Sequence, residues 1–101
     1  MTANALGLLG LARKAGKLEL GEEPVAAACR GRKARLVLLA ADGAQNTAGK
    51  AERLAQAANA RCVHTPFTKE ELGGALGRQV CAVAALTDEG FAKAFLEKLR
   101  D

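Results

Sequence analysis

Two uninterrupted apolar runs constrain the fold of this chain more than any other feature of its sequence. The first is residues 35–41, which are apolar after the initial Arg35. The second is residues 80–86. Neither run alternates apolar with polar residues, so each predicts a strand that is buried on both faces. Such strands need helices over both faces of their sheet, which places the chain in the α/β class.

The segments around these runs have the periodicities of helices and short strands. Leu and Ala recur at three- and four-residue spacing in the helical segments, whereas residues 17–20 alternate polar with apolar. We therefore predict an α/β sandwich in which a small sheet has helices on both faces. The predicted strands are residues 17–20, 35–41, 61–65 and 80–86, and the predicted helices are residues 3–15, 22–31, 46–58, 69–76 and 88–99.

Two helix starts are marked by residues that can cap them. Asn46 or Thr47 can cap the third helix, because their side chains can accept hydrogen bonds from the free N–H groups of a first turn. Before the fourth helix, Thr68 and Glu71 stand at the spacing of a capping box, in which each side chain bonds the other residue's backbone N–H.

The length and apolar content of the chain indicate one domain. It has 101 residues, of which 50% are hydrophobic, enough for the core of a single domain spanning residues 1–101. Charged residues or glycines interrupt every apolar run well before the roughly 20 residues of a membrane span. The charges near the N-terminus follow its apolar centre, which is the reverse of the order in a secretory signal. We therefore expect a cytoplasmic protein.

The sequence contains no recognisable constellation of catalytic or metal-binding residues. Cys29, Cys62 and Cys81 are odd in number and widely spaced, so we expect reduced thiols, packed as small hydrophobes, rather than disulfides or a zinc site. The one histidine, His64, falls in a predicted strand without a nearby nucleophile, and we expect it to be structural. The sequence thus predicts a protein that is not an enzyme and takes no metal or cofactor.

Basic residues gather in two segments that are close in sequence. The 15 Lys and Arg against 11 Asp and Glu give a net charge of +4, which favours polyanionic partners. With three Phe and neither Tyr nor Trp, the chain has no aromatic platform for unpaired bases, so an RNA ligand would be recognised by its backbone shape. A solvated basic surface is the alternative. The segments, which we expect to form one face, are Arg13, Lys14 and Lys17, and then Arg30, Arg32, Lys33 and Arg35.

Five segments, taken in order along the chain, resemble a known family. They are residues 8–17 (LLGLARKAGK), 21–23 (GEE), 35–40 (RLVLLA), 71–73 (ELG) and 87–92 (TDEGFA). Their order and coverage are similar to those of the L-seven-Ae/L-thirty-e ribosomal protein family, in particular its bacterial YlxQ-like branch. The resemblance implies a three-layer α-β-α sandwich with a small mixed sheet of about four strands.

The resemblance also implies a ligand and a binding surface. Members of this family recognise kink-turn RNA with the N-terminus of the second helix and neighbouring loops. The family's Gly falls on Gly21, its Asn on Glu23, its Glu on Pro24 and its Lys on Ala27, and a later acidic position falls on Ala44. Because an anion, a proline and methyl groups replace polar and cationic side chains, we expect weaker or differently specified binding.

The sequence therefore predicts a non-enzymatic, ribosome-associated protein that binds structured, kink-turn-like RNA, with ribosomal RNA as one candidate. The alternative is a protein-interaction adaptor that retains the fold and has lost the residues that recognise RNA. The expected RNA-binding residues are Lys14, Lys17, Gly21, Glu22, Glu23, Arg30, Arg32, Lys33, Gly77, Arg78 and Gln79.

Overall fold

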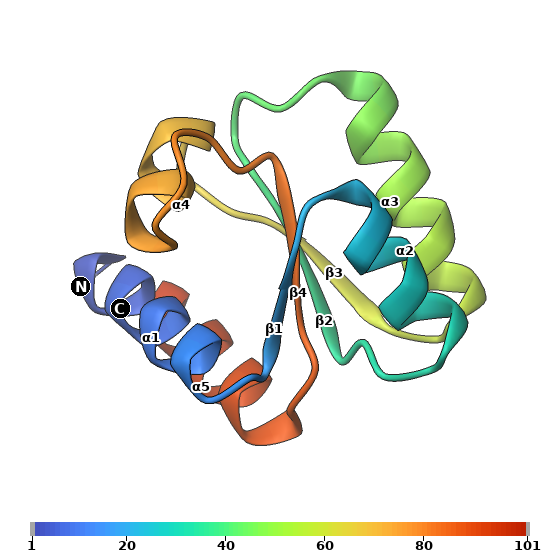
Figure 1. The fold of residues 1–101 in the computed structure, drawn as a ribbon, viewed down its shortest axis with the longest axis horizontal. Coiled ribbons are helices and arrows are strands. Elements are labelled where there is room, and N and C mark those ends of the chain that lie inside the picture. Colours follow the sequence, from blue (N-terminus) through green and yellow to red (C-terminus); the bar gives the residue numbers. More distant parts are fainter. Residues whose placement is uncertain (1, 101) are drawn as a thin grey trace.

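Both apolar runs form inner strands of a four-stranded sheet in the computed structural model, which describes residues 2–100 (Figure 1). The strand order is β1-β4-β2-β3, so β4 and β2 each have a neighbour on both sides. The strands are β1 (Leu18–Leu20), β2 (Leu36–Leu39), β3 (Arg61–His64) and β4 (Val83–Leu86), and the helices are α1 (Thr2–Lys14), α2 (Glu22–Arg30), α3 (Gln45–Ala57), α4 (Lys69–Ala75) and α5 (Glu89–Arg100).

The sheet is mixed because β4 runs against its neighbours. It pairs antiparallel with β1 and with β2, whereas β2 and β3 are parallel. In Figure 1, β1, β2 and β3 therefore finish at the upper end of the sheet, where β4 begins. We use "upper end" and "lower end" for these two ends of the sheet. The predicted α/β class and small mixed sheet are confirmed.

Helices cover both faces of the sheet and complete a three-layer α-β-α sandwich. Helices α2 and α3 lie on one face, and α1, α4 and α5 lie on the other (Figure 1). Along β2, Leu36 and Leu38 belong to one apolar cluster, whereas Val37 and Leu39 belong to the other. This alternation follows from the two-residue period of a strand, and it explains why the run is apolar at every position.

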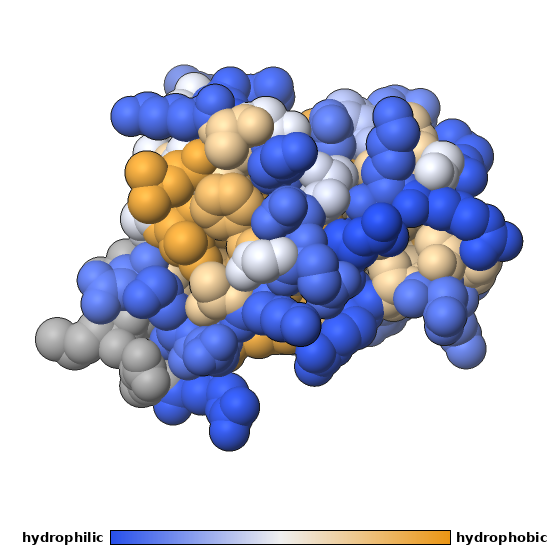
Figure 2. Space-filling model, turned by 90° about the horizontal axis from the view of Figure 1, so that it is seen from below, coloured by the Kyte–Doolittle hydropathy of each residue, from blue (hydrophilic) through white to orange (hydrophobic). Residues whose placement is uncertain are grey.

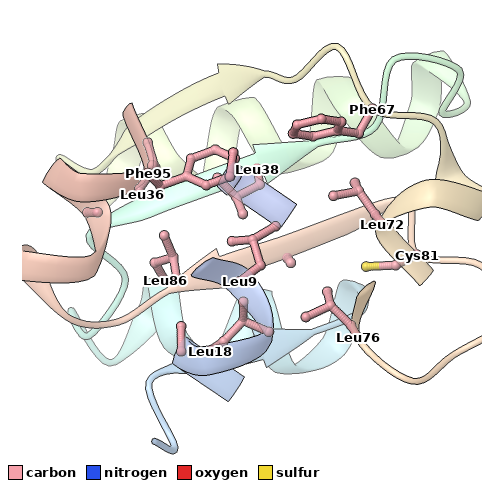
Figure 3. Close-up of a cluster of buried hydrophobic side chains, with 14 of the residues drawn as sticks. Leu9, Leu18, Leu36, Leu38, Phe67, Leu72, Leu76, Cys81, Leu86 and Phe95 are labelled. Carbon is pink, nitrogen blue, oxygen red and sulfur yellow. The ribbon is translucent and has the colours of Figure 1, made fainter. Parts of the chain in front are cut away.

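The larger cluster joins the strands to α1, α4 and α5. Leu9 of α1 and Phe95 of α5 are fully buried, and Leu72 and Leu76 contribute from α4 and the residue that ends it. Figure 3 shows Leu9 surrounded by side chains from the strands and from the neighbouring helices. Each fully buried leucine or phenylalanine of this size contributes about 1.5–3 kcal/mol.

Two local predictions are wrong. The last strand begins at Val83 rather than at residue 80, because Cys81 N donates to Lys69 O at 2.9 Å and ties the preceding segment to α4, which leaves the Val80 side chain 56% exposed. Neither Asn46 nor Thr47 caps the third helix, whose N-cap position is Ala44 without a side-chain bond.

The capping box before α4 is confirmed. Glu71 N donates to Thr68 Oγ1 at 3.1 Å, and Thr68 N donates to Glu71 Oε1 at 2.9 Å. At the last helix, Asp88 provides the cap, since Phe91 N donates to its Oδ2 at 3.0 Å. None of the helices between residues 2 and 100 is long and apolar enough to cross a bilayer.

Candidate nucleic-acid interface

The start of α2 lies at the upper end of the sheet and is held there by Gly21. Gly21 has φ 93° and ψ 168°, a conformation that only glycine adopts without strain. Its N–H donates to Val83 O at 3.0 Å, so the turn into α2 is fixed to the first residue of β4. The first-turn N–H groups of an α-helix have no intrahelical acceptor, and in α2 these belong to Glu22 and Glu23, because Pro24 has none.

The α4–β4 loop, residues 76–82, packs beside this turn. Gly77 has φ 73°, and Arg78 N donates to Gly73 O at 2.8 Å, which closes the loop onto α4. The guanidinium of Arg13 reaches over the loop from α1, with its Nη1 2.8 Å from the position that a Cβ on Gly77 would occupy. Arg78, Gln79 and Val80 are all exposed along the loop.

A shallow cavity of about 170 Å³ separates the loop from the start of α2. A cation, an exposed apolar side chain and main-chain groups meet there, which is a suitable set for a phosphate with its neighbouring sugar or base. The residues that line the cavity are Leu20, Gly21, Glu22, Arg78, Val80, Cys81, Ala82 and Val83.

Two side-chain contacts brace the loops of the upper end against one another. Lys69 N donates to Asp42 Oδ1 at 2.7 Å, which joins the β2–α3 turn to α4. Thr47 Oγ1 donates to Glu22 Oε2 at 3.4 Å, which joins α3 to α2. Arg13, Asp42 and Val80 were not among the expected site residues, and only their contacts in three dimensions assign them to this end.

The structure divides the expected RNA-binding residues into two groups. Gly21, Glu22 and Glu23 lie at the upper end, with the loop residues Gly77, Arg78 and Gln79. Lys17 lies at the lower end, where its carbonyl accepts a bond from Thr87 N beyond the last residue of β4.

The remaining basic residues accompany Lys17 at the lower end. Arg30 is the last residue of α2, so it lies about a helix length, roughly 13 Å, from Gly21. Arg32 and Lys33 belong to the loop between α2 and β2, and Lys14 ends α1 just before Lys17. Residues of the two basic segments therefore lie at the same end of the sheet, whereas α2 and the sheet separate them from the start of α2.

The upper end carries no excess of positive charge. By comparison, hydrophilic side chains cover most of the lower end, which is the end that Figure 2 views. At the upper end the carboxylates of Glu22, Glu23, Asp42, Glu70 and Glu71 accompany the cations of Arg13, Lys50, Lys69 and Arg78.

The cysteines have the chemistry of buried, unreactive thiols. Cys29 and Cys81 are buried and Cys62 is half-buried, and all three are free. Burial raises the pKa of each thiol, and for Cys62 burial, assisted by the charge of Glu52, raises the pKa to about 11. Thiols with raised pKa values are poor nucleophiles near neutral pH.

His64 and the other ligand-type residues do not converge on one site. The His64 side chain is 62% exposed at the end of β3, with its Nε2 2.6 Å from Glu52 Oε2. Within residues 2–100, no three His, Cys, Asp or Glu side chains come together in a group that could hold a metal ion.

Fold and site together define a small α-β-α domain whose candidate binding surface consists of braced loops at one end of a mixed sheet. The chain belongs to the ribosomal protein L7Ae/L30e/S12e/Gadd45 family, whose model matches residues 3–96. The family resemblance inferred from the sequence is thereby confirmed.

Similar proteins and structures agree with this assignment. The RNA-binding protein YlxQ of Bacillus subtilis (strain 168) is 37% identical, over 91% of each chain. The protein of the same name from Enterococcus faecium is 36% identical, over 88% of this chain and 84% of its own. A protein of unknown function from Bacillus halodurans has a TM-score of 0.88 at 28% identity, covering 96% of this chain and 97% of its own.

A more distant structure shares the fold. The Giardia lamblia 15.5kD RNA binding protein has a TM-score of 0.75 at 18% identity, covering 98% of this chain and 85% of its own. At this identity the likeness shows the three-layer architecture alone.

Proposed function

We propose that this protein binds structured RNA through the upper end of its sheet and catalyses no reaction. The observation that carries the proposal is the cavity between the start of α2 and the α4–β4 loop, which is lined by Glu22 of the first helical turn, by Arg78 and by the exposed Val80. Family membership and the names of the YlxQ proteins support RNA as the ligand.

The chemistry of the cavity favours a bent or irregular RNA over a smooth duplex. Main-chain N–H groups at a helix start bind phosphate or base acceptors without side-chain flexibility. Arg78 can place its planar guanidinium on a phosphate, and Val80 offers an apolar contact to a sugar or an unstacked base. We therefore propose a kink-turn-like RNA as the ligand, with a ribosomal RNA in the cytoplasm as the biological setting.

Three residues lower the expected affinity for a kink-turn RNA, compared with a surface that carries the family's usual side chains. Glu23 offers a carboxylate where an amide would both donate and accept, Pro24 removes a side-chain acceptor, and the exposed Ala27 lacks a cation. Binding then depends on main-chain groups and on Arg78, and the affinity for a kink-turn RNA is modest.

Fluorescence anisotropy with a short kink-turn RNA tests the proposal. The control RNA has its sheared G·A pairs replaced by Watson–Crick pairs, and the wild-type protein binds the kinked RNA more tightly than this control. Arg78→Gln reduces the affinity about tenfold, as expected for the loss of one charged contact. Arg53→Gln is the matched control variant. Arg53 is exposed on α3, so this substitution removes the same charge and should have little effect on RNA affinity. Equal binding of the two RNAs would exclude kink-turn recognition.

One observation favours a second candidate function, that of a protein-interaction adaptor. The carboxylates at the upper end repel phosphates, and the Glu22 and Glu23 side chains stand next to the N–H groups that RNA would use. An adaptor with a basic partner would fit such a surface. On this alternative the wild-type protein binds neither RNA at low salt, and Arg78→Gln has no effect on RNA affinity.

A further inference from the structure

Lys17 and Arg35 bring two cations together at the lower end of the sheet, and neither has an ion-pair partner within residues 2–100. Leu18, Leu86 and Leu36 are register partners on the adjacent strands β1, β4 and β2. The residues that precede β1 and β2, Lys17 and Arg35, therefore flank the end of β4, about 10 Å apart for two strand spacings. Their backbones are fixed, since Lys17 O accepts from Thr87 N at 2.9 Å and Arg35 N donates to Leu86 O at 2.8 Å.

The loop between α2 and β2 adds two more cations, Arg32 and Lys33, beside Arg35, and Arg30 ends the preceding helix. Lys33 N and Ala34 N both donate to Ala28 O, at 2.8 and 3.2 Å, so the loop is folded back onto the end of α2. Arg35 Nη1 donates to Arg32 O at 3.2 Å, and Arg32 has the left-handed φ of 57°. These bonds hold the loop backbone and the Arg35 side chain in a defined arrangement. We define the lower basic surface as Lys14, Lys17, Arg30, Arg32, Lys33 and Arg35, all of which are exposed.

Within residues 2–100, no carboxylate lies within ion-pair distance of these cations, and the acidic side chain that lines the adjoining groove is Glu19. The one ion pair within residues 2–100 joins His64 to Glu52, away from the lower end. Asp88, the carboxylate next to Thr87, already accepts the N–H of Phe91 as the cap of α5. The helix dipole accounts for a cation at the end of α1 or α2, such as Lys14 or Arg30, but not for Lys17, Lys33 or Arg35.

The shape of the lower end suits an extended polyanion rather than an apolar partner. Figure 2 shows hydrophilic side chains over most of this end, with the most hydrophobic patch at the left of the view. A shallow groove of about 380 Å³ follows α2 and β1 from the first turn of α2 to the lower end, where Lys33 lines it. The residues that line the groove are Gly16, Glu19, Pro24, Ala27, Ala28, Gly31, Lys33 and Thr87. Exposed cations spread over such a surface can contact several phosphates of one RNA segment.

We infer that the lower basic surface is a second RNA-binding surface, which holds the phosphate backbone of a segment distinct from the RNA at the upper end. The inference rests on the proposed function for its choice of RNA as the polyanion. The protein then contacts RNA at both ends of its sheet, with shape recognition at the upper end and electrostatic contact at the lower end. Such a molecule can fix the relative position of two RNA segments across its own body, whose longest dimension is 31 Å.

The experiment compares two RNA probes on the full chain. The first is the short kink-turn RNA, and the second is a regular RNA duplex without a bulge. The variant Lys17→Gln/Lys33→Gln/Arg35→Gln removes three charges from the lower basic surface. The control variant Arg53→Gln/Lys93→Gln/Arg100→Gln removes three exposed charges that belong to neither end. Circular dichroism and urea unfolding establish that both variants fold.

The inference predicts separate effects on the two probes. The lower-end variant binds the duplex at least about tenfold more weakly than the control variant, with a salt dependence reduced by about two to three contacts. Its affinity for the short kink-turn RNA changes less than twofold, whereas Arg78→Gln shows the opposite pattern. Wild-type protein saturated with the kink-turn RNA still binds the duplex.

Three outcomes would overturn the inference without touching the proposed function. They are equal duplex binding by the two triple variants, displacement of the duplex by the kink-turn RNA, and competition by polyglutamate as effective as that by RNA of equal charge. The opposite result is also informative. If the protein binds the duplex through the lower basic surface and does not bind the kink-turn RNA, the inference is supported and the kink-turn proposal is excluded.

Discussion

Gly73 of α4 lies directly against the backbone of Val80, so closely that a Cβ on Gly73 would stand 2.7 Å from Val80 N and Cα. Arg78 N donates to Gly73 O at 2.8 Å in the same contact. The absence of a side chain at Gly73 therefore lets the α4–β4 loop pack on its helix, and this packing sets the position of Arg78 in the candidate interface.

Gly73→Ala is expected to destabilise the protein by about 1–3 kcal/mol, because the new methyl group must displace backbone rather than a flexible side chain. The matched control is Gly74→Ala, since Gly74 has open space around its Cβ position and gains up to about 1 kcal/mol from helix propensity. Urea unfolding of both variants measures the difference. Equal stabilities would show that the loop does not rest on Gly73.

Gly21→Ala is expected to cost about 1–3 kcal/mol, the strain of an alanine at φ 93° and ψ 168°. Gly7→Ala in α1 serves as the control, because Gly7 has helical geometry and no atom within 4 Å of its Cβ position. Thermal or urea unfolding gives the stabilities. The strained turn also carries the first N–H groups of α2, so RNA affinity should fall with Gly21→Ala and stay unchanged with Gly7→Ala.

Thr68→Ala is expected to lower the free energy of unfolding by about 1 kcal/mol, because it removes the acceptor for Glu71 N in the capping box. Thr68→Ser keeps the hydroxyl and should restore most of the loss. Hydrogen exchange adds a local measurement, since the amide of Glu71 should lose protection in the alanine variant alone. A serine variant as unstable as the alanine variant would show that the methyl group, and not the cap, matters.

The half-buried thiol of Cys62 predicts a pH dependence at the alkaline end. Its pKa rises from 9.0 to about 11 in the folded protein, so between these values the unfolded chain has lost a proton that the folded protein keeps. The free energy of unfolding should therefore be unaffected below about pH 8 and should fall as the pH rises from about 9 to 11. Urea unfolding of the wild type and of Cys62→Ser at about pH 8 and about pH 10 isolates this contribution. If the stabilities of the two proteins change equally with pH, Cys62 makes no contribution to the pH dependence.

Ala27→Lys restores a cation at an exposed position on α2 and is expected to raise the affinity for the kink-turn RNA about tenfold. Gln56→Lys adds the same charge at an exposed position on α3 and should have little effect. Anisotropy titrations at two salt concentrations distinguish a specific contact from a general gain in charge. An adaptor that has lost RNA binding would respond to neither substitution.

Local patterns predicted most of the elements of this fold. The apolar runs identified β2 and β4 as inner strands, because only strands buried on both faces are apolar at every position. The spacing of Thr68 and Glu71 predicted a capping box that the structure contains. The same argument assigned Val80 to a strand. That prediction is wrong because Cys81 N donates to Lys69 O and keeps the segment on α4.

The sequence by itself determined the class of fold, the family, and the types of side chain available for binding, since each depends on residues near one another in the chain. Only the tertiary structure decided which of those side chains share a surface. Lys17 and Gly21 are four residues apart, yet β1 is extended and carries the chain about 13 Å from the lower end of the sheet to the upper. Strand direction therefore separates the cations from the start of α2 and places them at opposite ends of the sheet.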